Sequence, residues 1–255
     1  MQGRASRACI GSNPTTGDFN LSNKPGLRLL HSRQLPSPAV FVSSKARDTL
    51  LPSTLLLGLT GRDFTIIAAS KAAMRGATIL KSSDDKTRQL NKNTLLAFSG
   101  EAGDTIQFAE FIQANIALYT MRNETDLGPS AVASFIRSEL ARSLRSRKPY
   151  NVNLLLGGMD PITKQPSLYW LDYLASSAKV PYAAHGYAQY YCLSILDKHH
   201  HPDISFEQGM KILRMCTDEL QRRLPIDFKG MTVKVIKKDG IVDLEYDTSK
   251  QVLAA

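Results

Sequence analysis

Cysteine is scarce and apolar runs are short in this 255-residue chain. The three cysteines, Cys9, Cys192 and Cys216, are too few and too scattered for a disulfide framework or a paired-cysteine metal site, a pattern typical of a reducing compartment. No apolar run approaches the ~20 residues that a helix needs to cross a bilayer. The sequence therefore predicts a soluble protein with buried thiols.

Extremes of composition are also absent. Hydrophobic residues make up 43% of the chain and charged residues 22%, which excludes a wholly disordered or collagen-like protein. The length allows one large domain or two small ones, with a core that needs neither disulfides nor metal.

The net charge of +9 is unevenly distributed. Residues 1–53 hold seven Lys or Arg against two Asp, a net of +5, which leaves +4 for residues 54–255. Because the charges of residues 54–255 nearly balance, the sequence gives no evidence of a surface that binds phosphate groups. We expect neither a nucleic-acid nor a membrane partner.

The first 53 residues have five of the twelve prolines, no glutamate and no sustained periodicity. Three explanations stay open: a disordered extension, an organelle transit peptide, or upstream sequence that is not in the mature protein. We predict an extension over 1–53 and one domain over 54–255.

Short apolar runs separated by turn residues predict strands from Thr54 onward. We expect the first five strands to form one antiparallel sheet and the last two to form a closing hairpin. The expected strands are 55–59, 64–69, 77–80, 87–90, 94–99, 151–156, 168–173, 231–236 and 241–244.

Apolar residues at three- and four-residue steps predict four helices. Pro129 suits a first helical position, and Ser205 with Gln208 forms a capping-box pattern. The basic residues that precede Pro149 either terminate the second helix or contact an acidic surface of a partner. The expected helices are roughly 102–121, 129–148, 186–198 and 205–224.

The expected order is strands, two helices, strands, two helices, strands. Closely linked strands favour antiparallel pairing over a parallel doubly wound sheet. Because both sheets look apolar on both faces, we predict an α+β fold, a four-layer α-β-β-α sandwich with mainly antiparallel sheets.

Several segments resemble beta-type subunits of the eukaryotic 20S proteasome, most closely the non-catalytic subunits at ring position four. They include KSSDDKTRQL at 81–90, GEAGDTIQFAEFIQ at 100–113 and AAHGY at 183–187, and the resemblance covers 54–247. It implies the same sandwich, known in this family as the N-terminal-nucleophile hydrolase fold.

Active members of that family cleave peptides with an N-terminal threonine. Its hydroxyl needs a base, and its own α-amino group can serve only after the upstream peptide is removed. The resemblance places Thr54 at the nucleophile, Lys86 at the catalytic lysine and Gly100 at the glycine that supports the oxyanion.

Four departures weaken the catalytic interpretation. Ser70 replaces the family's aspartate, so we expect the lysine to lose its carboxylate partner. Ser53 replaces the glycine that precedes the nucleophile, and Tyr187 replaces a serine. The loop 227–230 keeps an aspartate at Asp227 where the family has one, but Lys229 or Gly230 stands where another serine is expected.

We therefore interpret Lys86 as a structural cation beside Asp84 or Asp85, Gly100 as a tight turn and Thr54 as an ordinary strand start. The chain is predicted to be a non-catalytic subunit, without cofactor or metal, of the chamber for ubiquitin- and ATP-dependent protein degradation. The alternative is an active N-terminal threonine peptidase with Thr54 as nucleophile.

Other candidate sites are weaker. The histidines 199–201 follow one another and rarely supply convergent metal ligands, so a solvated loop is expected. His185 is expected to be a core or interface histidine. Cys192 and Cys216 fall on apolar helix faces.

The resemblance also implies partners and place. The expected partners are neighbouring beta subunits, the opposite beta ring and the alpha ring, in an obligate hetero-oligomer of the cytoplasm and nucleus. The apolar segment 187–193 is an expected interface, and the isolated subunit is expected to be poorly stable.

Overall fold

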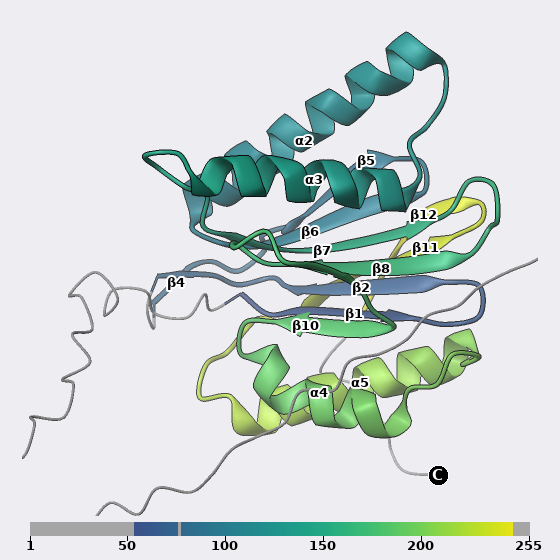
Figure 1. The fold of residues 1–255 in the computed structure, drawn as a ribbon. Coiled ribbons are helices and arrows are strands. Elements are labelled where there is room, and N and C mark those ends of the chain that lie inside the picture. Colours follow the sequence, from purple (N-terminus) through teal and green to yellow (C-terminus); the bar gives the residue numbers. More distant parts are fainter. Residues whose placement is uncertain (1–53, 76–77, 247–255) are drawn as a thin grey trace, which may run out of the picture. The chain divides into compact units, whose positions relative to one another are not determined.

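The computed structural model describes residues 54–75 and 78–246, and the predicted extension over 1–53 lies outside them. Strands and helices follow in the predicted order of blocks (Figure 1). The strands are β1 (Leu56–Thr60), β2 (Thr65–Ser70), β3 (Ala73–Arg75), β4 (Thr78–Lys81), β5 (Thr87–Asn91), β6 (Thr94–Gly100), β7 (Val152–Met159), β8 (Pro166–Leu171), β9 (Ser177–Lys179), β10 (Tyr182–His185), β11 (Met231–Lys237) and β12 (Gly240–Leu244). The described helices are α2 (Ala102–Asn123), α3 (Pro129–Leu144), α4 (Ala188–His199) and α5 (Phe206–Arg223).

Two five-stranded antiparallel sheets form the centre of the domain. The first has the order β10-β1-β2-β11-β12 and the second the order β5-β6-β7-β8-β9. Helices α2 and α3 cover the outer face of the second sheet, and α4 and α5 cover the outer face of the first (Figure 1). The predicted four-layer α-β-β-α sandwich is confirmed.

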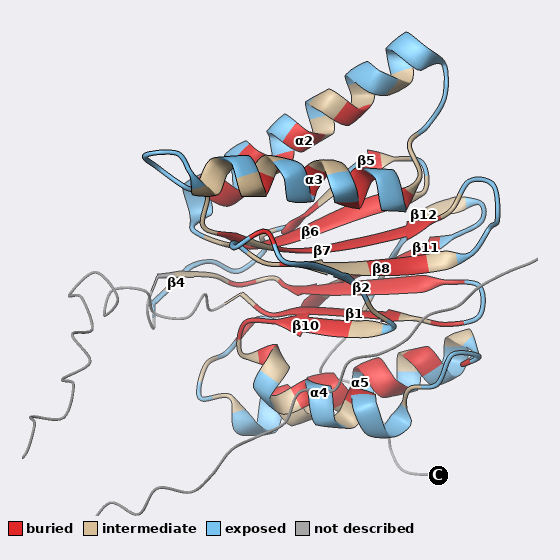
Figure 2. Cartoon of the chain, in the orientation of Figure 1, coloured by how far each residue is buried: buried red, intermediate tan, exposed pale blue. Residues whose placement is uncertain are grey.

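Alternation along the strands explains why both sheets are buried on both faces. In β1 and the residue before it, Leu55, Leu57 and Leu59 join the core under α4 and α5, whereas Leu56 joins the core between the sheets. Strand β6 divides in the same way, with Leu96 packing toward α2 and α3. Side chains of period two thus fill three separate cores, and the central strands β1, β2, β6 and β7 are buried along most of their length (Figure 2).

The prediction that the first five strands share one sheet was wrong. Strands β1 and β2 belong to one sheet and β5 and β6 to the other, while β3 and β4 form a two-stranded ribbon of their own. Because each early hairpin is apolar on both faces, it needs later strands beside it: β2 pairs with β11, and β6 pairs with β7. Closeness in sequence therefore did not decide sheet membership.

The helix predictions are confirmed to within two residues at most ends, but the second helix ends at Leu144, before the predicted stop near Pro149. The capping box is present, because Ser205 Oγ accepts the Gln208 N–H and the Gln208 side chain accepts the Ser205 N–H. The closing hairpin of β11 and β12 is also confirmed.

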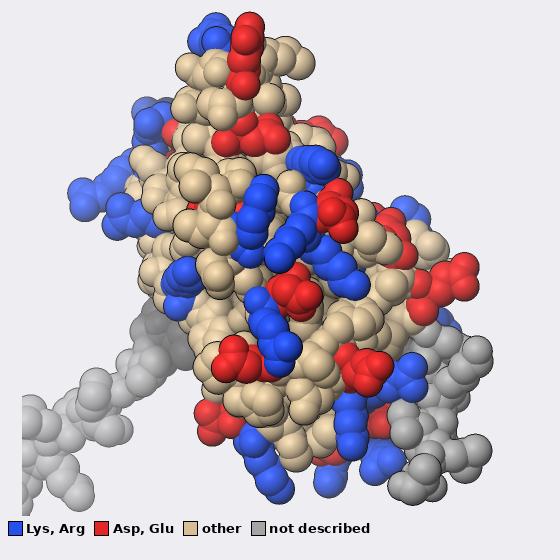
Figure 3. All heavy atoms as spheres, turned by 90° about the vertical axis from the view of Figure 1, so that its right-hand side faces the viewer, with Lys and Arg blue, Asp and Glu red and all other residues tan. Residues whose placement is uncertain are grey.

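The short strands β3, β9 and β10 were not predicted. None of the described helices is both long enough and apolar enough to cross a membrane. On the face shown in Figure 3, basic and acidic side chains are interspersed over the described surface.

Candidate functional site

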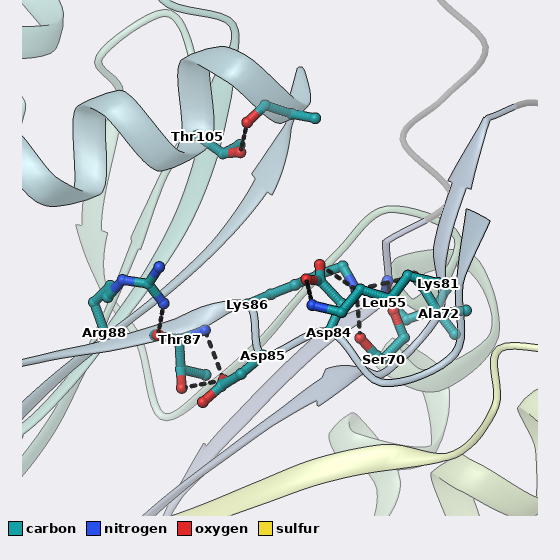
Figure 4. A network of polar contacts seen from close by, with 11 residues as sticks. Leu55, Ser70, Ala72, Lys81, Asp84, Asp85, Lys86, Thr87, Arg88 and Thr105 are labelled. Carbon is teal, nitrogen blue, oxygen red and sulfur yellow. Dashed lines mark hydrogen bonds and ion pairs between the residues drawn. The ribbon is translucent and has the colours of Figure 1, made fainter. Parts of the chain in front are cut away.

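Lys86 lies at the centre of a buried polar cluster between the end of β2 and the start of β5 (Figure 4). Its Nζ donates to the carbonyl oxygens of Ser70, at 2.7 Å, and Ala72, at 2.9 Å. The residue is only 6% exposed. Burial lowers the pKa of Lys86, and the carboxylate of Asp84 opposes that shift.

The expectation that Lys86 lacks a carboxylate partner is corrected by this geometry. Asp84 Oδ2 lies 3.5 Å from Nζ, so the ammonium has an anion, supplied from its own strand-entry loop instead of from position 70. Of the two acids expected beside Lys86, Asp84 makes the contact. Asp85 instead accepts from Thr87 N, at 3.0 Å, and from Lys234 Nζ, at 2.9 Å.

The Asp84 carboxylate is itself held in place. Its Oδ1 lies 3.3 Å from Lys81 Nζ, and its backbone N–H donates to the Lys71 carbonyl at 2.9 Å. The contact with Lys71 ties the loop before β5 to the chain that leaves β2, and the contact with Lys81 ties it to the end of β4. The lysine, its anion and its two carbonyl acceptors therefore form one structural unit.

Ser70 occupies the position of the family's aspartate at the end of β2, where it is fully buried. Its Oγ accepts the Leu55 N–H at 3.1 Å, and its own N–H donates to the Leu55 carbonyl at 2.9 Å. A neutral hydroxyl here satisfies a buried amide, a role that needs no charge. It also anchors the chain one residue after half-buried Thr54.

Gly100 is required by its conformation. Its φ is +134°, and a Cβ there would lie 2.1 Å from the Asn151 carbonyl oxygen. The same carbonyl accepts the Glu101 N–H at 3.1 Å, which ties the end of β6 to the residue before β7. This is the tight strand-to-helix turn that the sequence predicted, and it accounts for the glycine without catalysis.

The remaining candidate positions lie near α4 and α5. Tyr187 caps the start of α4 and packs against the core beneath that helix. In the loop before β11, Lys229 forms an ion pair with Asp227 at 2.6 Å, and this contact lowers the pKa of Asp227. Loop 224–230, with Gln221, lines a surface pocket of about 470 Å³.

The histidines have structural contacts. His185 is buried, with Nε2 3.0 Å from the Leu154 carbonyl oxygen and its ring stacked on Trp170, so the prediction of a core histidine is confirmed. His200 Nε2 lies 2.7 Å from the Thr60 carbonyl oxygen. Over the described residues, no three His, Cys, Asp or Glu side chains gather in a way that could hold a metal ion.

Two of the three predicted buried thiols are in the described residues. Cys192 on α4 and Cys216 on α5 are both buried, and Cys192 Sγ lies 3.6 Å from the Cys216 carbonyl oxygen. The hydrogen bond with Cys216 and burial raise the pKa of the Cys192 thiol, which keeps it protonated. Cys9 lies outside the described residues.

Sequence reasoning missed two members of the lysine cluster. Leu55 and Ala72 contribute only backbone atoms, so their side chains carry no signal of the contact. The sequence held no signal for these contacts, because every residue type supplies a carbonyl and the strand that follows Lys86, TRQLN, is mostly polar. Ser53, the replacement for the family's glycine, lies outside the described residues.

Comparison with known proteins agrees with the fold. Residues 53–236 match the family described as "Proteasome subunit". The chain is 79% identical over 201 residues to a protein of Neurospora crassa named probable proteasome subunit beta type-4, covering 79% of this chain and 99% of that protein. It is 54% identical over 187 residues to the proteasome subunit beta type-4 of Saccharomyces cerevisiae, covering 73% and 94%.

A plant relative is more distant. The proteasome subunit beta type-2 of Oryza sativa subsp. japonica is 40% identical over 185 residues, covering 72% of this chain and 86% of that protein. The α-β-β-α sandwich of antiparallel sheets is thus the N-terminal-nucleophile hydrolase fold. Within that class, the chain belongs to the proteasome subunit family, among its beta-type members, which assemble with other proteasome subunits in the core particle.

Proposed function

We propose that this chain is a non-catalytic beta subunit that builds the beta ring around the degradation chamber of the 20S proteasome. One observation carries the proposal: the three N–H donors of the Lys86 ammonium have three acceptors within the chain, Ser70 O, Ala72 O and Asp84 Oδ2. All three acceptors are structural, and none is a threonine hydroxyl.

The chemistry of the alternative makes larger demands. For Thr54 to act, its hydroxyl must first attack the carbonyl of Ser53, and the freed α-amino group must then serve as base. Ser70 has no carboxylate that could orient a lysine toward that hydroxyl. Its Oγ instead accepts the Leu55 N–H. The arrangement supports a chain that is anchored at Leu55, just before β1, and an uncut bond before Thr54.

The proposed place is ring position four, between two other beta subunits, against the opposite beta ring and below an alpha ring. A position in the beta ring is supported by the names of two relatives, proteasome subunit beta type-4 and proteasome subunit beta type-2. We propose the cytoplasm and nucleus as its location, and the two buried free thiols fit a reducing compartment.

The mass of the mature polypeptide tests the proposal. We expect the chain from a purified particle to retain Ser53 or residues upstream of it, measured by intact-mass spectrometry. The catalytic subunits of the same particle, which lose their leader peptides, are the internal control. A mature chain that begins at Thr54 would contradict the proposal and favour the active peptidase.

Covalent labelling gives a second test. A threonine-directed epoxyketone or β-lactone should leave this chain unmodified under conditions that label the catalytic subunits of the same particle completely. Modification of Thr54 in the native chain would overturn the proposal, whatever the state of the upstream residues.

A further inference from the structure

A strongly basic segment ends α3 and forms the turn before β7. Residues 137–148 contain five basic residues and one acidic residue, Glu139. All five basic residues are exposed. They are Arg137, Arg142, Arg145, Arg147 and Lys148.

Partners within the chain account for part of this charge. Arg142 forms an ion pair with Glu139 at 3.1 Å. Lys148 Nζ lies 3.9 Å from Asp104 Oδ1, and its side chain remains 83% exposed. No Asp or Glu carboxylate of residues 54–75 and 78–246 lies within ion-pair distance of Arg145 or Arg147.

Helix termination accounts for another part. The negative end of a helix dipole attracts cations within about one turn, which suits Arg142 in the last turn of α3. The helix ends at Leu144, and Arg147 and Lys148 lie beyond the capping residue Arg145. Their positions therefore need another explanation.

The turn that carries these cations is fixed. Ser143 accepts twice, its carbonyl from Ser146 N at 2.9 Å and its Oγ from Tyr150 N at 2.9 Å. Asn151 N donates to Asp104 Oδ2 at 3.2 Å, which ties the end of the turn to the first turn of α2. Because the backbone is already ordered, a ligand of these side chains does not have to order it.

We propose that residues 145–148 are a docking surface for carboxylates on an adjoining proteasome subunit. The proposal rests on the assembly described above. Guanidinium groups match carboxylates in a two-point geometry, and exposed arginines without internal partners complement an acidic surface.

The surroundings of the turn favour a protein over a nucleic acid. Tyr150, the aromatic residue next to the turn, packs on Phe108 with ring centroids 5.1 Å apart, so its ring is not free to stack on a base.

A carbodiimide applied to the purified particle tests the contact in the native sequence. The reagent joins the Lys148 amine to a carboxylate as an amide, and the displaced oxygen leaves on the carbodiimide as a urea. We expect mass spectrometry to find Lys148 joined to an Asp or Glu of another subunit. A link only to Asp104 or Glu139 of the same chain, or no link, would overturn the proposal.

Charge reversal tests the contribution of the arginines. The double variant Arg145→Glu and Arg147→Glu, expressed beside the wild-type chain, should enter the particle about tenfold less, an effect in the range of losing a close charge pair. The milder Arg145→Gln and Arg147→Gln pair should show a smaller loss in the same direction. The control, Lys92→Glu with Lys164→Glu, reverses the charge of two exposed lysines outside residues 145–148 and should enter normally.

The outcomes separate the two proposals. If the wild-type chain is in the particle and the reversal variant enters equally well, the docking surface is wrong and the proposed function stands. If the wild-type chain is absent from the particle, the proposed function itself fails. Retention of RNA by the full-length chain through Arg145 and Arg147 would also overturn the docking surface.

Discussion

The ammonium of Lys86 shows how neighbouring acceptors can stabilise a buried charge. A charged side chain that is 6% exposed is costly unless acceptors surround it, and here two carbonyls and one carboxylate do so. The sequence predicted the contact with Asp84 as one of two choices. It could not predict the carbonyls of Ser70 and Ala72, because any residue type supplies a carbonyl.

Replacing Lys86 with methionine tests that structural role. Lys86→Met leaves the Ser70 and Ala72 carbonyls buried without a donor, and we expect a local loss of about 3 kcal/mol. Hydrogen exchange in the purified particle should become at least tenfold faster over residues 68–75. Lys81→Met is the control, because Lys81 makes an exposed ion pair and should change exchange little. Unchanged exchange in Lys86→Met would contradict the structural role.

His185 gives the domain a dependence on pH. Burial lowers the pKa of His185 from 6.5 to about 4, so the folded chain binds fewer protons than the unfolded chain between these values. Stability is therefore highest above pH 6.5, falls as the pH drops toward 4, and loses about 3 kcal/mol in all.

Deuterium exchange at the imidazole C2 position, measured by mass spectrometry on the particle, gives the pKa of His185 directly. The exposed His201 in the same digest is the reference. A His185 that titrates near its ordinary value would contradict the buried, neutral ring.

At the scale of elements, helices were more predictable than strand pairing. An apolar stripe of period 3.6 defines a helix from its own residues, and α5 even showed its capping box in the sequence. A strand that is apolar on both faces shows only that it is buried. Its neighbours are chosen by distant residues, as β2 beside β11 illustrates.

The turn between β6 and α2 offers a matched pair of glycines. Gly100→Ala would place a Cβ against the Asn151 carbonyl at positive φ, and we expect a cost of about 3 kcal/mol or more. Gly103→Ala, in the first turn of α2 with open space around it, should be neutral or stabilising by up to about 1 kcal/mol. The amount of each variant recovered in assembled particles measures the difference. Equal recovery would contradict a steric requirement at position 100.

At the scale of the whole domain, Gly157 lies where the two sheets pack closely against each other. A Cβ at Gly157 on β7 would lie 2.7 Å from Ile67 Cδ1 and 2.9 Å from Ile236 Cδ1, both on the other sheet. Gly157→Val should therefore force the sheets apart and cost about 3 kcal/mol. The measurement is hydrogen exchange over β2 and β11, with Gly103→Val as the control. Protection equal to that of the wild type would show that the sheets can adjust.

The sandwich itself was predictable from runs of apolar residues, since two sheets buried on both faces leave few other packings. The division of strands between the sheets was not, because the β3-β4 ribbon carries the chain from one sheet to the other without a distinctive composition.

The stacked pair of Trp170 and His185 joins these scales. The indole on β8 and the imidazole on β10 belong to different sheets, and their centroids are 5.1 Å apart. Trp170 is the single tryptophan of the chain. Its fluorescence therefore reports whether the two sheets have packed against each other, and it can be followed during refolding without any added label.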